Sequence, residues 1–239
     1  MGLREEWENK AASWMELATN DPYYDLLNLP AFLPLVPTPG RLTLEVGCGE
    51  GRVARALAGL GHRVVAVDGS PSLARAAASR GTPVALADAA ALPVPDGAAD
   101  VLVSFMVLMD VDHLEACVAE LGRVLAPGGT LCMGIIHPIA TAGLFVPGDP
   151  NRTFYVGEYL RRMSHVLDVE RQGSSTTIRF HIEHRPLEAY SRALEAAGLV
   201  ITAVREPAPS EEAVAQHDEL ADWRRVPNFL HLTAERRRP

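Results

Sequence analysis

Three glycines at alternate positions mark the stretch of this sequence where chemistry is most clearly indicated. Gly47, Gly49 and Gly51 follow an apolar run that contains the acid Glu45. Glycine permits a tight turn and leaves the main chain uncovered, so this spacing predicts a turn against which a ligand lies closely. Asp68 stands 19 residues after Gly49, at the end of the next apolar run. An acid at that distance accepts hydrogen bonds from the two hydroxyl groups of a ribose, so the pattern predicts a nucleoside site.

The spacing separates this turn from two other nucleotide-binding loops. A nicotinamide dinucleotide fingerprint has a third glycine at the position that Arg52 occupies here. A phosphate-binding P-loop would require a Lys followed by Ser or Thr, and this turn has neither. We therefore expect a nucleoside without a pyrophosphate.

A turn of this kind needs a sheet behind it, and the flanking sequence alternates between strand and helix patterns. Short apolar runs predict strands at 41–46, 62–68, 83–88, 99–108, 130–136, 199–206 and 228–235. Helical periodicity and capping signals predict helices at 3–18, 51–61, 70–81, 113–125 and 186–197. Apolar strands that alternate with helices indicate an α/β fold, with a mostly parallel sheet covered on both faces.

Composition excludes several classes of protein. The 239 residues carry a formal charge of −8, which disfavours nucleic acid as a partner. The three cysteines, Cys48, Cys117 and Cys132, have no metal-binding spacing and form no disulfide framework, so we expect no metal site and a reducing compartment. The charged start of the chain does not resemble a signal peptide, and no apolar run is long enough to span a membrane. A cytoplasmic protein with no membrane partner is expected.

Four segments in the same order and spacing resemble the class I S-adenosylmethionine-dependent methyltransferases. These are "LEVGCGEG", Asp68, "LADAAALPVPDGAADVLVSFMVLMDV" and "LGRVLAPGGTL". The resemblance is close over residues 40–136 and loose over the last two strands. It implies a doubly wound, Rossmann-like sheet of seven strands, most of them parallel, that binds S-adenosyl-L-methionine.

The resemblance also implies a division of the chain. Residues 1–40 would form an N-terminal helical cap. Residues 41–137 and 185–239 would form the Rossmann-like domain that binds the cofactor. Residues 138–184 would form an insertion after the fifth strand that shapes the acceptor pocket, with two strands around the turn at 171–175.

At the methionine end of the cofactor, the family pattern assigns contacts to the glycine turn. Gly47, Cys48 and Gly49 would line the methionine part, and Glu45 would bind its amino group directly or through water. Tyr24, in the cap, would close over the cofactor or touch the acceptor, and a packed cap is the alternative.

At the adenosine end, the resemblance assigns the ribose hydroxyls to Asp68. Gly69 and Ser70 would lie beside the adenine. Asp88 would accept from the exocyclic amine of the adenine, and the backbone of Ala89 would meet the edge of the ring. A solvated loop carboxylate is the alternative for Asp88.

The reacting centre is expected just past the fourth strand. Phe105 and Met106 would border the sulfonium, and plain core packing is the alternative for both. An oxygen or nitrogen acceptor can need a general base. His137 is placed first for this role because it ends the fifth strand, followed by His113 and His184, with a structural hydrogen bond as the alternative for each.

The function expected from the resemblance is methyl transfer to an oxygen, nitrogen or carbon atom of a small metabolite, including the compounds of secondary metabolism. The insertion is rich in side chains that suit an apolar or ring-bearing acceptor: Phe145, Phe154, Tyr155, Tyr159 and Met163. A cyclase or isomerase that keeps the cofactor as a structural or electrostatic element is the alternative. A non-catalytic binding module is disfavoured because the cofactor motif is intact. A homo-oligomer is left open.

Overall fold

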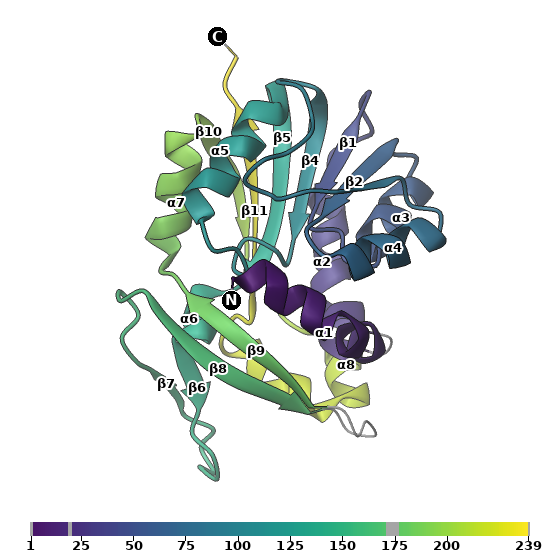
Figure 1. Ribbon diagram of the computed structural model, residues 1–239. Helices are drawn as coiled ribbons and strands as arrows, with labels where there is room; N and C mark the ends of the chain where they lie inside the picture. Colours follow the sequence, from purple (N-terminus) through teal and green to yellow (C-terminus); the bar gives the residue numbers. More distant parts are fainter. Residues whose placement is uncertain (1, 19–20, 171–176, 239) are drawn as a thin grey trace.

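Seven strands pair into one sheet in the computed structural model, which describes residues 2–18, 21–170 and 177–238. The strand order is β10–β11–β5–β4–β1–β2–β3 (Figure 1). The strands are β1 Thr43–Val46, β2 Val64–Asp68, β3 Val84–Leu86, β4 Ala99–Phe105, β5 Leu125–Ile136, β10 Leu199–Arg205 and β11 Phe229–Arg236. Strand β11 is antiparallel to both of its neighbours, and the ladders from β5 to β3 are parallel. The predicted seven-stranded, mostly parallel sheet is confirmed.

Helices cover both faces of this sheet because successive strand residues point to opposite sides. The helices are α3 Arg52–Gly59, α4 Pro71–Ser79, α5 Leu114–Val124 and α7 Leu187–Ala196. In β4, Leu102 packs in the cluster that includes residues of α5 and α7, whereas Val101 and Val103 pack with α3. The switch of strand order between β1 and β4 lies at the centre of this layered structure.

The fifth strand is longer than the sequence indicates. We expected the segment "APGG" to end a helix before a strand at Thr130, but β5 already begins at Leu125. The pairing with β4 jumps from Ala99–Leu125 to Val101–Thr130, so the extra residues form a bulge. Gly128, at φ +78°, supplies the left-handed backbone that such a bulge requires.

The N-terminal segment folds over the carboxyl ends of the strands. Helix α1 Leu3–Leu17 confirms the predicted helix and is followed by the π-helical turn η2 Tyr23–Asn28, then α2 Leu29–Phe32 and η3 Leu33–Leu35. The backbone N–H of Leu3 donates to Asp112, which follows β4, and Arg4 Nε donates to the carbonyl oxygen of Gly69, which follows β2, at 2.9 Å. These contacts fix α1 across the edge of the sheet where β2 and β4 end.

The segment between β5 and α7 forms two hairpins. Strand β8 Met163–Glu170 pairs antiparallel with β9 Thr177–His184, which confirms the two predicted strands, although the turn at 171–175 lies outside the described residues. The part of this segment before β8 forms α6 Pro138–Thr141 and the hairpin of β6 Gly143–Phe145 and β7 Phe154–Val156. In Figure 1, α1 lies between the sheet and the β8–β9 hairpin.

The acidic connection between β10 and β11 is partly helical, as expected. It forms α8 Glu211–Gln216 and the 3-10 helix η4 Asp218–Arg224. Within the described residues, no helix has the length and apolar character needed to cross a membrane.

Candidate active site

A cavity of about 670 Å³ lies at the carboxyl ends of β1, β2 and β4, beneath α1. This is the place where the strand order reverses, and open α/β sheets bind their ligands there. Every position that the sequence analysis assigns to the cofactor lines this cavity: Tyr24, Glu45, Gly47, Cys48, Gly49, Asp68, Gly69, Ser70, Asp88, Ala89, Phe105 and Met106. The fold thus brings the whole predicted set together.

The glycine turn brings bare main chain to the cavity. Gly47 and Gly49 have φ values of +76° and +55°, which favour glycine. A Cβ atom on Gly47 would lie 2.3 Å from Cγ2 of Val107, so no side chain fits there. A Cβ atom on Gly49 would meet nothing within 4 Å. Gly49 therefore faces open space, and a ligand can approach its backbone directly.

The carboxylate of Asp68 is buried and closes the turn. Its Oδ2 accepts from the N–H of Gly49 at 2.7 Å, and its Oδ1 accepts from the N–H of Ser70 at 2.8 Å. Burial nevertheless raises the pKa of Asp68 above its ordinary value. Each carboxylate oxygen keeps a second lone pair, so Asp68 can still accept from two adjacent hydroxyl groups.

Glu45 carries a carboxylate oxygen without a partner inside the cavity wall. The side chain is buried, and no hydrogen bond reaches its Oε2. Burial, together with the nearby charges of Asp68 and Glu50, raises the pKa of Glu45 to about 8. A buried polar atom with no partner costs free energy, and a cationic donor would relieve that cost. The residues at this end therefore fit the amino group and the sulfonium of S-adenosylmethionine.

Arg52 also lines the cavity, although the sequence analysis considered it only as a departure from the dinucleotide fingerprint. Its Nε donates to Glu50 at 3.2 Å, and its guanidinium lies 4.4 Å above the ring of Tyr24. Its Nη1 lies 3.5 Å from a carboxylate oxygen of Asp25, and its Nη2 donates to the carbonyl oxygen of Ala18, so the guanidinium joins the cap to the glycine turn. The signal in the sequence was a cation at the first helical position after the glycine turn.

The adenosine end is covered by α1. Asp88 is exposed and accepts from the N–H of Ala90 at 2.8 Å, and Arg4 lies 3.9 Å from its Oδ2. Asp88 thus lines the cavity and is exposed to solvent. This position is compatible with a contact to the adenine amine and with a solvated loop carboxylate. Ala89 is partly buried beside it.

Phe105 ends β4, Met106 follows it, and both line the cavity. The ring of Phe105 is buried, with its centroid 4.5 Å from that of Phe32 and 5.5 Å from that of Tyr24. It serves core packing and lines the cavity at once. Met106 has φ +60°, an uncommon conformation for a residue with a side chain. Such strain often gathers at functional sites.

The three histidines proposed as bases lie in different environments. His113 is exposed and lines the cavity. His137, the first choice, does not: its Nδ1 accepts from the N–H of Ile139 at 3.0 Å, and its Nε2 lies 3.0 Å from Glu206. The chain turns into α6 directly after β5, so the ring of His137 caps that helix instead of facing the crevice.

His184 is also outside the cavity lining. It is wholly buried, with Nδ1 2.7 Å from the hydroxyl of Thr141 and Nε2 2.7 Å from the carbonyl oxygen of Tyr159. Both ring nitrogens of His184 are thus used in packing the insertion. The geometry corrects the assignment of His137 and His184 and leaves His113 as the one of the three that reaches the cavity.

The aromatic residues expected to contact the acceptor lie elsewhere. Phe145 and Phe154 pack against the ring of Trp223, and the hydroxyl of Tyr159 accepts from the N–H of Leu187. Neither these three nor Tyr155 and Met163 line the cavity. The β6–β7 hairpin packs against η4 through these rings. Strand β9 contacts α1 and supplies Phe180 and Ile182 to the cavity lining.

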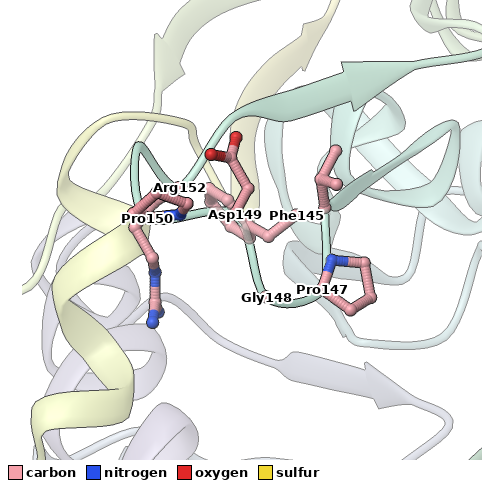
Figure 2. A pocket seen from close by; sticks show the side chains of 7 residues that line it. Phe145, Pro147, Gly148, Asp149, Pro150 and Arg152 are labelled. Carbon is pink, nitrogen blue, oxygen red and sulfur yellow. The ribbon is translucent and has the colours of Figure 1, made fainter.

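A small pocket of about 430 Å³ lies in the loop between β6 and β7, and Figure 2 shows the side chains around it. Arg152 belongs to this loop, but its guanidinium is paired with Asp222 of η4. Arg161 and Arg162 are likewise paired, with Glu158 and Glu115. Surface ion pairs account for these three arginines.

The cavity has two halves. We call the part lined by the predicted cofactor residues the cofactor half. We call the acceptor half the part lined by six residues from distant parts of the chain: Trp7, Trp14, Asp110, His113, Phe180 and Ile182. Except for His113, the sequence analysis assigned none of them to a binding site, because their contacts depend on how α1 and β9 dock.

Comparison with known proteins agrees with this geometry. Residues 44–133 match the family of the methyltransferase domain. A malonyl-[acyl-carrier protein] O-methyltransferase from Serratia marcescens is 35% identical over 118 residues, which are 46% of this chain and 46% of that protein. The chain thus spans about half the length of this curated relative.

Solved structures match more of the chain. A methyltransferase of Mesorhizobium loti described as S-adenosylmethionine-dependent shares 24% identity, with a TM-score of 0.73 over 91% of this chain and 99% of that one. A [4+2]-cyclase also shares the fold, with 20% identity and a TM-score of 0.55 over 88% of this chain and 79% of that one. The matched segment 44–133 holds the glycine turn, Asp68, Phe105 and Met106. This segment matches the methyltransferase-domain family, and the chain has the fold of solved S-adenosylmethionine-dependent methyltransferases.

Proposed function

We propose that this protein transfers a methyl group from S-adenosyl-L-methionine to a small acceptor molecule. One observation carries the proposal: the cofactor half joins an uncovered glycine turn, the closing carboxylate of Asp68 and the unpartnered Oε2 of Glu45 in one cavity. The acceptor half opens from the same cavity, so a second molecule can reach the reacting centre.

The chemistry divides between cofactor and protein. When bound, the cofactor supplies a methyl group made electrophilic by the sulfonium. The protein must hold the two reactants in line and exclude water, which can provide much of the rate. Phe105 and Met106 contribute apolar side chains to the cavity lining, and residues of α1 line it as well. His113 and Asp110 are the titratable side chains of the acceptor half that could receive a proton.

Two features support a small acceptor. The cavity is lined in part by residues of α1 and β9, and its volume is typical of small-molecule sites. The formal charge of −8 disfavours nucleic acid as a partner. We also propose, from the composition and the three buried, unpaired cysteines, that the protein works in a reducing compartment such as the cytoplasm.

Calorimetric titration with S-adenosylhomocysteine tests the cofactor site. We expect the wild-type protein to bind this product and Asp68→Ala to bind roughly 100-fold more weakly, because a charged hydrogen-bond acceptor is lost. Asp168→Ala, on the β8–β9 hairpin, is the control and should bind normally. Wild-type protein that does not bind S-adenosylhomocysteine would refute the proposal.

Incubation with methyl-labelled cofactor separates transfer from the alternative. A cyclase or isomerase that retains the cofactor would convert its substrate without moving the label. Label in the product, with S-adenosylhomocysteine formed in equal amount, is the result expected here.

A further inference from the structure

The loop after β4 holds an acidic side chain at the wall of the acceptor half. The N–H of Asp110 donates to the carbonyl oxygen of Val107 at 2.7 Å. Arg185, itself buried, donates to the carbonyl oxygens of Met109 at 3.1 Å and Val111 at 2.6 Å. The backbone on both sides of Asp110 is thus fixed by one guanidinium. A carboxylate carried on such a rigid loop is preorganised for binding.

Within the described residues, no hydrogen bond or ion pair joins the carboxylate of Asp110 to another side chain, although Asp110 lines the cavity. Lys10 and Arg185 are close enough to favour its charged form, and Glu6 opposes it. Burial outweighs these charges and raises the pKa of Asp110 to about 7. The acceptor half therefore has a carboxyl group that a bound cation would hold in its charged form.

Aromatic rings stand in the same half of the cavity. The ring centroids of Trp7 and Trp14 are 5.4 Å apart, and that of Phe180 lies 6.1 Å from Trp7 and 6.3 Å from Trp14. All three rings line the cavity, whereas Lys10 does not. The Lys10 ammonium lies 4.4 Å from the centroid of Trp7 and 4.9 Å from that of Phe180. The protein thus already uses these rings to hold an ammonium group on one side.

A carboxylate without a partner beside electron-rich rings is complementary to an organic cation. A neutral hydroxyl group would gain less from Asp110, and a carboxylate would be repelled by it. We propose that the acceptor is an amine on an apolar, ring-bearing body, whose ammonium binds Asp110 among Trp7, Trp14 and Phe180 and whose nitrogen receives the methyl group. This inference rests on the proposed methyltransferase function.

The reaction balances with the groups at hand. The bound ammonium gives one proton to Asp110, and the freed lone pair of nitrogen attacks the methyl carbon. A carbon–nitrogen bond forms, the carbon–sulfur bond breaks, and its electron pair stays on sulfur. The products are a methylated ammonium, S-adenosylhomocysteine and one proton, which Asp110 passes to water.

Three compounds with the same ring system test the inference by calorimetry, on protein saturated with S-adenosylhomocysteine. Tryptamine carries an ammonium, tryptophol a hydroxyl and indole-3-propionate a carboxylate. We expect tryptamine to bind at least roughly tenfold more tightly than tryptophol, and indole-3-propionate to bind most weakly. Asp110→Asn should remove the preference for tryptamine, whereas Asp168→Asn should keep it.

The outcomes separate this inference from the proposed function. Failure to bind S-adenosylhomocysteine would refute the methyltransferase itself. If that product binds but tryptamine gains nothing over tryptophol, or if Asp110→Asn keeps the preference, the amine assignment is wrong. Absence of binding by all three compounds at millimolar concentration would also overturn it. Normal affinity of Asp110→Asn for S-adenosylhomocysteine would show that the variant is folded.

Discussion

The two halves of the cavity are built in different ways. The cofactor half is largely main chain from short, neighbouring segments, with Gly47 and Gly49 after β1 and Asp68 after β2. The acceptor half consists of side chains from segments far apart in the sequence, such as Trp7 of α1 and Phe180 of β9. One half is specified by local spacing, and the other exists only after the cap and the insertion have docked.

This difference sets how each half can fail. Main-chain geometry tolerates little change, because a turn with positive φ accepts few residues besides glycine. A surface made of side chains from several elements can lose one member and keep its shape. A single backbone change in the cofactor half should therefore cause a large loss of stability and affinity. A single side-chain change in the acceptor half should cause a smaller loss.

The largest effect is expected at Gly47. In Gly47→Ala the new methyl group would lie 2.3 Å from Val107, whose branched side chain is stiff, in a backbone with φ +76°. We expect a loss of about 3 kcal/mol or more in the free energy of unfolding, together with loss of affinity for S-adenosylhomocysteine. Urea unfolding and calorimetric titration measure the two.

Gly49→Ala is the matched control in the same turn. Its methyl group would meet nothing within 4 Å, so only the left-handed backbone is penalised. A loss of about 1 kcal/mol in stability is expected. Equal losses for the two variants would contradict the view that close packing against Val107, and not φ alone, requires glycine at position 47.

The histidines provide the next contrast. His184→Ala would remove the hydrogen-bond partner of the Tyr159 carbonyl oxygen and one of the two partners of the Thr141 hydroxyl, which keeps its bond to the carbonyl oxygen of Pro138, and would leave a cavity in a buried site, so we expect a loss of about 2–3 kcal/mol in the free energy of unfolding. His113→Ala, at an exposed position, should change stability by less than about 0.5 kcal/mol. Thermal unfolding compares them. A stable His184→Ala protein would restore that residue as a candidate for a functional role.

Much of the fold follows from the sequence alone. The strand and helix patterns between Arg41 and Ile136 are local, and the sheet they predict is present. The spacing of Gly49 and Asp68 likewise predicts their contact, which is a direct hydrogen bond of 2.7 Å. These features depend on residues whose neighbours in space are also near in sequence or in adjacent strands.

The acceptor half could not be predicted in the same way. Chain position suggested that His137 faces the crevice, but the helix that starts after it takes up its ring. Composition suggested Phe145 and Phe154, but their hairpin packs against Trp223. Asp110 had no sequence signal, because its role depends on burial and on the docking of α1. Tertiary packing decides these positions.

The pH dependence of cofactor binding tests the role of Glu45 in the cofactor half. Its pKa is raised to about 8, so ligand-free protein holds a proton there at neutral pH. A bound ammonium favours the charged carboxylate, so binding should release that proton. Affinity for S-adenosylhomocysteine should rise as pH increases from 6 to 8, by up to about tenfold per unit, and level off above. Calorimetric titrations in buffers of different ionisation enthalpy measure how many protons are released on binding.

Glu45→Gln is the control for this effect. It removes the titrating group, so the rise in affinity between pH 6 and 8 should flatten. The stability of ligand-free wild-type protein should change in the opposite sense. Because the folded pKa lies above the unfolded value of 4.5, stability is highest below that value and falls as pH rises toward 8. A pH-independent affinity would show that Glu45 does not meet a cation.

The smallest effect is expected at Glu8, which ties the two halves together. Its carboxylate accepts from the N–H of Ser72 at 2.9 Å and from the hydroxyls of Ser72 and Ser70 at the start of α4, and these bonds lower its pKa to about 2. The bonds are complete above pH 4.5 and are lost only as pH falls toward 2. Glu8→Ala should free α1 from the cofactor half at neutral pH.

We expect this variant to bind S-adenosylhomocysteine about threefold more weakly and to show greater acrylamide quenching of tryptophan fluorescence, since Trp7 and Trp14 lie on α1. Glu5→Ala, at an exposed position of the same helix, is the matched control for helix propensity. If quenching rises while the affinity is unchanged, α1 covers only the acceptor, and the halves are independent. If quenching and affinity change together, docking of α1 couples cofactor binding to formation of the acceptor half. The segments of the acceptor half then assemble on the cofactor half.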